Sequence, residues 1–274
     1  MNRRVFLALA GLAAWPVLTG CSSAAPVPAP RAPGLDDPDR KHVAEAIISS
    51  FENSTTTLPY DAAQRLDDGR GITAGRAGFT SGTHDLLLVV RRYEQVAGPQ
   101  NPLHRYVRPL TRIDEQGGGS GTSGLDGFED VWRRTSRTDP RLNQAQDAVY
   151  DELYFRPAMD QSRPLGLTTA LGQLVILDTA VQHGRGGPDG LLALIAETDR
   201  QQEGGSDAER TVWLRQFLEV RRAHLRDPAD DETTEVWRES IPRVDTLVSL
   251  IDQRRFDLAT PLTWTFAGSR FSVG

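Results

Sequence analysis

Residues 171–181 constrain the fold of this chain more than any other segment, because they are apolar on almost every side of a helix. A helix without a polar face has to be covered all round by other elements, which requires helices that pack in more than one layer. Asp178 lies inside this apolar run, and a buried carboxylate needs a partner. We predict that Arg221 and Arg243 pair with it.

Helical periodicity also marks the segments on either side of a short glycine-rich stretch. The first helix is predicted to begin at Asp37 and Pro38, which suit the cap and the first helical position, and to end near Asn53. A second helix is predicted from Thr83, which can cap it. The turn signal and the glycines of residues 66–79 predict a small hairpin or an irregular sheet between these helices.

The rest of the chain is predicted to be mostly helical. Residues 114–127 are rich in glycine and are expected to form a flexible loop. Beyond this loop, helices are predicted over residues 143–155, 165–182, 189–200, 208–226 and 243–254. The expected fold class is therefore mostly α, or α+β, with one small β element.

The N-terminus predicts export and lipidation. Residues 1–4 are basic, residues 5–18 are apolar, and the residues before Cys21 have the small-side-chain pattern of a bacterial lipoprotein signal. An apolar stretch of 14 residues is too short to cross a bilayer core of about 30 Å. Cleavage would leave Cys21 as the lipid anchor. The chain then divides into a signal peptide (1–20), a Pro-, Ala- and Ser-rich tether (21–35) and a folded domain (36–274).

Composition excludes several classes of function. The 31 Lys and Arg residues against 37 Asp and Glu give a net charge of −6, which argues against nucleic acid as a partner and suits a cationic ligand. The single cysteine excludes an intramolecular disulfide. The five histidines lack metal-ligand spacing, and the glycine-rich stretches lack a P-loop or a strand-linked GxGxxG. We therefore expect neither a metal nor another cofactor.

Two carboxylates flank the start of the glycine-rich segment. Glu52 lies at the end of the first helix beside Phe51 and four residues after Ile48, where burial would raise its pKa. Asp68 stands in an Asp-Gly turn. Each also has an ordinary structural explanation, Glu52 as a capping or solvated residue and Asp68 as a turn former. As a pair they suit glycoside hydrolysis, which needs one protonated carboxyl for the leaving oxygen and one ionised carboxylate for the attacking water.

Several motifs carry a family resemblance through their order and spacing. They are Phe51–Ser54, Leu66–Asp85, Val149–Ala158, Ala170–Gln173, His183–Gly184 and Arg243–Thr246. Together they resemble the chitosanases of glycoside hydrolase family 46. The resemblance implies a two-lobed, lysozyme-like, mostly helical fold, with a small β-sheet in one lobe and the cleft between the lobes. It makes residues 36–274 a chitosanase-like catalytic domain.

The same resemblance implies an endo-acting, inverting hydrolase of the β-1,4 glucosaminidic bonds of chitosan. The catalytic residues would be Glu52 as general acid, Asp68 as general base and Thr73 as a holder of the attacking water. The substrate-binding residues would be Arg70, Asp85 and His183. A buried charge network that supports the catalytic acid would consist of Asp178, Arg221 and Arg243.

The chain departs from the family pattern at three positions. The family commonly has Phe-Cys-Ser-Gly-Thr-Gly-Asp where this chain has Thr80 in place of the cysteine and His84 in place of the second glycine. Ala62 stands where an aromatic residue is often found. These differences concern the surroundings of the site, whereas the catalytic residues are all present.

The expected partners are chitosan or its oligosaccharides and, through lipidated Cys21, the outer face of the cell membrane, from which the protein could also be released. We expect a monomer that binds no nucleic acid. Two other functions stay open: a lysozyme-like hydrolase of peptidoglycan, and a surface lipoprotein that binds polysaccharide without turnover. The presence of Glu52, Asp68 and Thr73 together argues against the second of these, because a binding module needs no acid, base or water holder.

Overall fold

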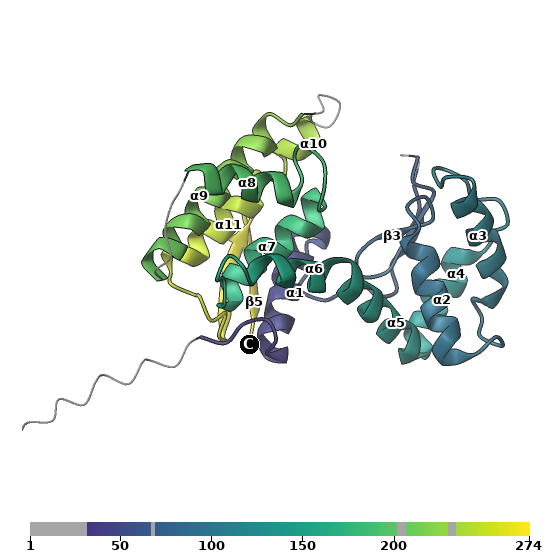
Figure 1. Ribbon diagram of the computed structural model, residues 1–274. Coiled ribbons are helices and arrows are strands. Elements are labelled where there is room, and N and C mark those ends of the chain that lie inside the picture. The colour runs from purple at the N-terminus through teal and green to yellow at the C-terminus, as the bar shows by residue number, and fades with distance from the viewer. Residues whose placement is uncertain (1–31, 67–68, 202–206, 230–233) are drawn as a thin grey trace, which may run out of the picture. The chain divides into compact units, whose positions relative to one another are not determined.

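The computed structural model describes residues 32–66, 69–201, 207–229 and 234–274 (Figure 1). Residues 32–274 form one compact unit. The predicted signal peptide, Cys21 and Asp68 lie outside the described residues. Among the helices that are described, none combines the length and the apolar character that a membrane crossing needs.

One group of elements, the sheet lobe, combines four helices with a small sheet. The sheet is antiparallel in the order β1-β2-β3, so that β2 is central. Its members are β1 (Ala63–Arg65), β2 (Ile72–Ala74), β3 (Phe79–Thr80), α2 (Asp85–Ala97), α3 (Val107–Glu115), α4 (Phe128–Thr138) and α5 (Pro140–Tyr150), with a short 3-10 turn η1 (His104–Tyr106) before α3. The predicted small sheet is therefore present, and Thr73 lies on its central strand.

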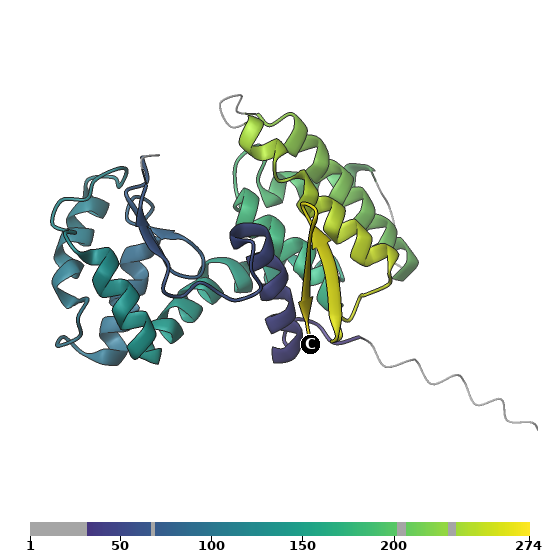
Figure 2. The ribbon, with the colours of Figure 1, turned by 180° about the vertical axis from the view of Figure 1, so that it is seen from behind.

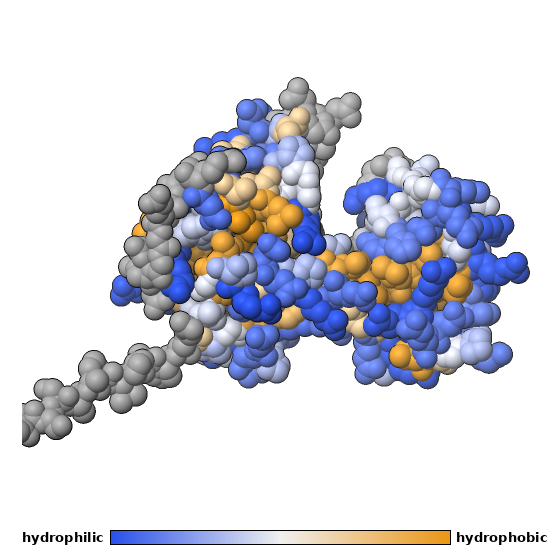
Figure 3. Space-filling model, viewed as in Figure 1, coloured by the Kyte–Doolittle hydropathy of each residue, from blue (hydrophilic) through white to orange (hydrophobic). Residues whose placement is uncertain are grey.

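The second group, the hairpin lobe, packs six helices with a two-stranded hairpin (Figures 1 and 2). Its members are α1 (Pro38–Asn53), α7 (Ala170–His183), α8 (Leu191–Gln201), α9 (Asp207–Arg226), α10 (Thr234–Arg238), α11 (Ile241–Asp252), β4 (Leu262–Phe266) and β5 (Ser269–Val273). A π-helical turn, η2 (Asp151–Phe155), continues α5 into α6 (Arg156–Ser162) and connects the two lobes. Figure 3 shows hydrophobic surface over this connection, where Leu153, Phe155 and Met159 are partly buried.

Helix α1 begins as its sequence predicts. The Asp37 side chain accepts hydrogen bonds from the backbone N of Asp39 and Arg40 at 3.0 and 3.1 Å, and Pro38 takes the first helical position. A buried stripe that includes Val43, Ile47 and Phe51 fixes the helix against the core. The opposite face is free to carry polar groups toward the pocket described below.

Helix α7 is the buried centre of the hairpin lobe, as predicted. All of Leu174, Val175, Ile176, Leu177, Asp178 and Thr179 are buried. The chain before α1 packs on this helix, because Leu35 is fully buried and its backbone N donates to Gln173 Oε1 at 2.6 Å. The last residues of the predicted tether therefore belong to the compact unit.

One local prediction was wrong. Thr83 does not cap α2; the cap position is His84, and the Thr83 hydroxyl bonds to Asp85 instead. His84 has φ +73°, a conformation that glycine adopts without strain and other residues seldom take. Residues 116–127 contain neither helix nor strand, as expected of the predicted loop, and this loop is hydrogen-bonded to the chain before α2. Gly119 N donates to Gly82 O at 3.1 Å, and a Cβ on Gly118 would collide with that same carbonyl.

Candidate active site

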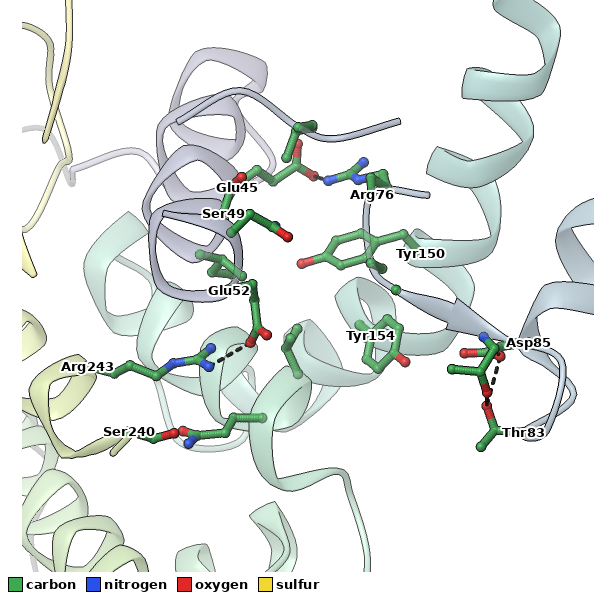
Figure 4. A pocket seen from close by; sticks show the side chains of 18 of the residues that line it. Glu45, Ser49, Glu52, Arg76, Thr83, Asp85, Tyr150, Tyr154, Ser240 and Arg243 are labelled. Atoms are coloured by element: carbon green, nitrogen blue, oxygen red, sulfur yellow. Dashed lines mark hydrogen bonds and ion pairs between the residues drawn. The ribbon is translucent and has the colours of Figure 1, made fainter. Parts of the chain in front are cut away.

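A pocket of about 510 Å³ lies where α1, the β2–β3 turn, α2, α5, α7 and α11 approach one another. Four of the predicted site residues line it: Glu52, Arg70, Asp85 and Arg243. Figure 4 shows Glu52 and Asp85 on opposite sides of this pocket, with Tyr154 between them. The structure therefore brings together carboxylates that are 33 positions apart in the sequence.

Glu52 occupies the last turn of α1 and points into the pocket (Figure 4). Of the two possibilities that the sequence left open for its carboxyl, burial beside Ile48 and Phe51 does not occur, since the side chain is 42% exposed. Phe51 turns into the core, where its ring lies 4.9 Å from that of Phe266. The Glu52 carboxylate instead accepts a hydrogen bond on Oε1 from Arg243 Nη1 at 2.6 Å.

The predicted pairing of Asp178 with two arginines is confirmed. Arg221 Nη1 donates to Asp178 Oδ2 at 2.7 Å, and Arg243 Nη2 donates to Oδ1 at 2.6 Å. Burial opposes ionisation of this fully buried carboxyl, but Arg243 and Arg221 outweigh it and hold the pKa of Asp178 below its usual range. A continuous chain of ion pairs therefore runs from Arg221 through Asp178 and Arg243 to Glu52.

His183 extends this network away from the pocket. Its Nδ1 bonds to the backbone O of Asp189 at 2.8 Å, and its Nε2 accepts a hydrogen bond from Arg221 Nε at 3.2 Å. Burial, with the charge of Arg221, lowers the pKa of His183 to about 3, so the ring is neutral. Among the described residues that line the pocket His183 is absent, whereas Trp237, which meets its ring edge-on at 4.8 Å, is present. The substrate-binding role expected of His183 stays a prediction.

Asp85 is the first residue of α2 and is held by its own turn. Its Oδ1 accepts hydrogen bonds from Thr80 N, Thr83 Oγ1 and Leu86 N at 2.7, 2.9 and 2.9 Å. Burial raises the pKa of Asp85, and these hydrogen bonds oppose the rise. Thr80, which replaces the family's cysteine, bonds through its hydroxyl to that of Thr83 at 2.6 Å. The substitution therefore adds a hydroxyl to the support of this carboxylate.

Strand β2 carries Thr73, one of the predicted catalytic residues. Thr73 pairs with Gln64 on β1 and with Thr80 on β3, and it is not among the described residues that line the pocket. Asp68 lies outside the described residues, in the sequence between β1 and β2. The residues on either side of this segment are hydrogen-bonded, because the backbone N of Leu66 donates to the backbone O of Gly71 at 2.8 Å.

Sequence reasoning missed several pocket residues: Glu45, Ser49, Arg76, Tyr150, Tyr154 and Trp237. Glu45, Ser49 and Glu52 recur at helical spacing on α1, so their shared face was available as a signal. No such signal marks Arg76, whose partners lie on two other elements. In the part of the chain that the structure describes, no group of His, Cys, Asp and Glu residues is arranged to hold a metal ion.

Comparison with known proteins identifies the family of the chain. The model of the family described as Glycosyl hydrolase family 46 matches residues 46–262. A chitosanase from Bacillus subtilis (strain 168) is 43% identical over 227 residues, which cover 82% of this chain and 81% of that protein.

Solved structures are similar over almost the same length. A mutant chitosanase from Bacillus subtilis MY002 complexed with 6 GlcN is 40% identical with a TM-score of 0.76, covering 87% of this chain and 99% of that chain. A chitosanase from Gynuella sunshinyii in complex with chitotetraose is 41% identical with a TM-score of 0.75, covering 86% of this chain and 97% of that chain. The predicted fold class, mostly helical and lysozyme-like with a small sheet in one lobe, is confirmed, and the β4–β5 hairpin is a second sheet that was not predicted. The chain belongs to glycosyl hydrolase family 46.

Proposed function

We propose that this protein is a chitosanase that cleaves the β-1,4 glucosaminidic bonds of chitosan within the polymer. One observation carries the proposal: Glu52, oriented by Arg243, and Asp85 face a common pocket in a chain about 40% identical to chitosanases solved with 6 GlcN or with chitotetraose. Carboxylates on both sides of the pocket suit a substrate that carries an ammonium group on its sugars. Asp85 and Arg70 are the pocket residues proposed to bind these sugars.

The proposed mechanism inverts the anomeric centre. Glu52 protonates the leaving oxygen, while Asp68 takes a proton from a water that attacks the opposite face of the sugar. Thr73 helps to hold this water. Arg243 engages Oε1 of Glu52, which leaves Oε2 to carry the proton toward the substrate. Asp178 and Arg221 keep Arg243 in place for this role.

Hydrolysis of two polymers, chitosan and peptidoglycan, and two variants test the function. We expect the purified protein to release reducing ends from chitosan and to give the α-anomer first, as followed by NMR. Glu52→Gln and Asp68→Asn should each lose activity by about 10²–10⁴-fold, because an amide can neither give nor take the proton, while chitosan oligomers still bind. Release from peptidoglycan instead would identify a lysozyme-like hydrolase, and binding without release a polysaccharide-binding protein. A β-anomer formed first would rule out inversion.

We also propose that the protein is an exported lipoprotein, attached by lipidated Cys21 to the outer face of the cell membrane. The support comes from the sequence: a basic start, a short apolar segment, a small-residue pattern before Cys21 and a Pro-rich segment after it. A tether of this kind would let an anchored enzyme reach a polymer outside the cell.

A further inference from the structure

A second ion pair lies in the same pocket, at a distance from the Glu52–Arg243 pair (Figure 4). Arg76 follows β2 in the turn before β3, and its Nη2 lies 3.0 Å from Glu45 Oε1 on α1. Its Nη1 bonds to Asp147 on α5. The Arg76 side chain is 3% exposed and that of Glu45 is 11% exposed, so water screens this pair only weakly.

The turn that carries Arg76 is held on several sides. The guanidinium lies over the Tyr150 ring at 4.3 Å and the Tyr60 ring at 5.7 Å. The backbone N of Arg76 donates to Gln146 Oε1 at 3.0 Å. The backbone before it approaches α4 so closely that a Cβ on Gly75 would lie 2.9 Å from the Trp132 ring. The position of the turn is therefore fixed both by ion pairs and by packing.

This ion pair connects the two elements on which the proposed chemistry depends. Glu45 and Glu52 are seven residues apart on α1, which is about 10.5 Å along a rigid helix. Arg76 is three residues after Thr73, whose strand β2 also pairs with β1. The Arg76–Glu45 contact therefore ties the helix of the proposed acid to the strand of the proposed water holder.

We propose that Arg76 is a positioning residue, which locks the β2–β3 turn onto α1 and so sets the separation between Glu52 and the catalytic groups of the sheet. The inference rests on the proposed function. An inverting hydrolase needs its two carboxyls far enough apart to admit a water, roughly 6.5–9.5 Å. A displacement of about 1 Å at a distant support can lower a rate by about 10²-fold.

Kinetics on a glucosamine hexamer test the role in catalysis. Arg76→Gln should lower kcat by about 10–100-fold and change KM by less than about 3-fold, because the variant removes none of the residues that are proposed to bind the sugars. Arg76→Lys should lie between this variant and the parent, since lysine keeps the charge but loses the two-pronged contact. Guanidinium added to Arg76→Ala should restore part of kcat, whereas sodium chloride at equal ionic strength should not.

Lys41→Met is the matched control. Lys41 lies 4.0 Å from the same Glu45 and 2.6 Å from Asp151, so this variant removes a cation from α1 without touching the β2–β3 turn. It should keep the parental kcat. Equal losses of kcat in Lys41→Met and Arg76→Gln would mean a general loss of stability and would overturn the proposal. A rise in KM with kcat unchanged would assign Arg76 to substrate binding instead.

A measurement without substrate separates this proposal from the proposed function. The chain has one cysteine, so Cys21→Ser leaves none, and spin labels can be placed at two exposed positions through Asp39→Cys on α1 and Gln64→Cys on β1. The distance distribution between the labels should broaden or shift in Arg76→Gln and stay parental in Lys41→Met. An unchanged distribution in Arg76→Gln would refute the positioning role, whether or not the parent hydrolyses chitosan.

Discussion

Glu52 meets the pocket with one carboxylate oxygen already bound to Arg243. This arginine is 5% exposed, and its other terminal nitrogen is bound to Asp178. The ring of Phe51 lies 5.2 Å from its guanidinium carbon and closes one face. The orientation of Glu52 is therefore set by a buried aspartate that has no access to the substrate.

Replacement of this aspartate gives a prediction for stability. Asp178→Ala should lower the free energy of unfolding by about 3–5 kcal/mol, because it leaves buried Arg221 without its counter-charge and Arg243 with Glu52 as its one remaining partner in this network. Urea unfolding measures the loss. Asp245→Ala is the matched control, since it removes a pair of similar length, 2.6 Å to Arg222, whose aspartate is 58% exposed. We expect this control to lose less than about 1 kcal/mol. Equal losses in the two variants would contradict a buried, paired Asp178.

The residue scale also shows where sequence reasoning works. The partners of Asp178 were predictable, because a carboxylate in an apolar helix requires cations. The surroundings of Glu52 were not. Helical periodicity shows only that Glu52 lies beside Ile48 and Phe51, whereas its hydrogen-bond partner Arg243 is 191 positions away in the sequence. Contacts between residues so far apart depend on how the helices pack, and the spacing of residues along one helix does not predict that packing.

At the scale of elements, His224 fastens α9 to α8 and to the segment before α8. Its Nδ1 bonds to Asp189 Oδ1 at 2.7 Å and its Nε2 to Glu197 Oε2 at 3.0 Å. The Asp189 carboxylate also accepts a hydrogen bond from Ala229 N at 2.9 Å. Burial opposes the charged ring, but the two carboxylates outweigh it and raise the pKa of His224 above its ordinary value.

The raised pKa of His224 predicts how the stability of the protein depends on pH. A raised pKa in the folded state contributes stability that is fully present below the unfolded value, about 6.5, and is lost as the pH rises through the folded value. His224→Gln should therefore destabilise the protein more at pH 5.5 than at pH 9. Urea unfolding of the parent and of His224→Gln at each pH gives the difference in their free energies of unfolding. The contributions of other titrating groups, including His183, are common to both proteins and cancel in this difference. A difference independent of pH would contradict a charged His224 between the carboxylates.

Elements with local signals were predictable and others were not. Asp37 and Pro38 predicted the start of α1 correctly, because capping depends on neighbouring residues alone. The β4–β5 hairpin was missed. Its two turn residues, Ala267 and Gly268, have φ of +46° and +80°, a turn usually marked by Asn-Gly or Asp-Gly. The pairing of β4 with β5 holds Ala267 in this conformation, and no local sequence pattern predicts that pairing.

At the scale of the whole molecule, the proposed anchor predicts where the protein is found. The full-length protein should partition with membranes, and Cys21→Ser should abolish this because no acyl chain can then be attached. Activity on chitosan should be unchanged, since residues 32–274 form a compact unit of their own. Cell fractionation measures the partition. A Cys21→Ser protein that is processed and still sediments with membranes would exclude lipidation at Cys21.

The ion pairs from Arg221 through Asp178 and Arg243 to Glu52 contain two cations and two anions. Their formal charges cancel when all four groups are ionised. The proton that a general acid must carry removes one negative charge, and it leaves the cluster with an excess positive charge on side chains at most 5% exposed. Transfer of the proton to the leaving oxygen restores the formal electroneutrality of the four groups.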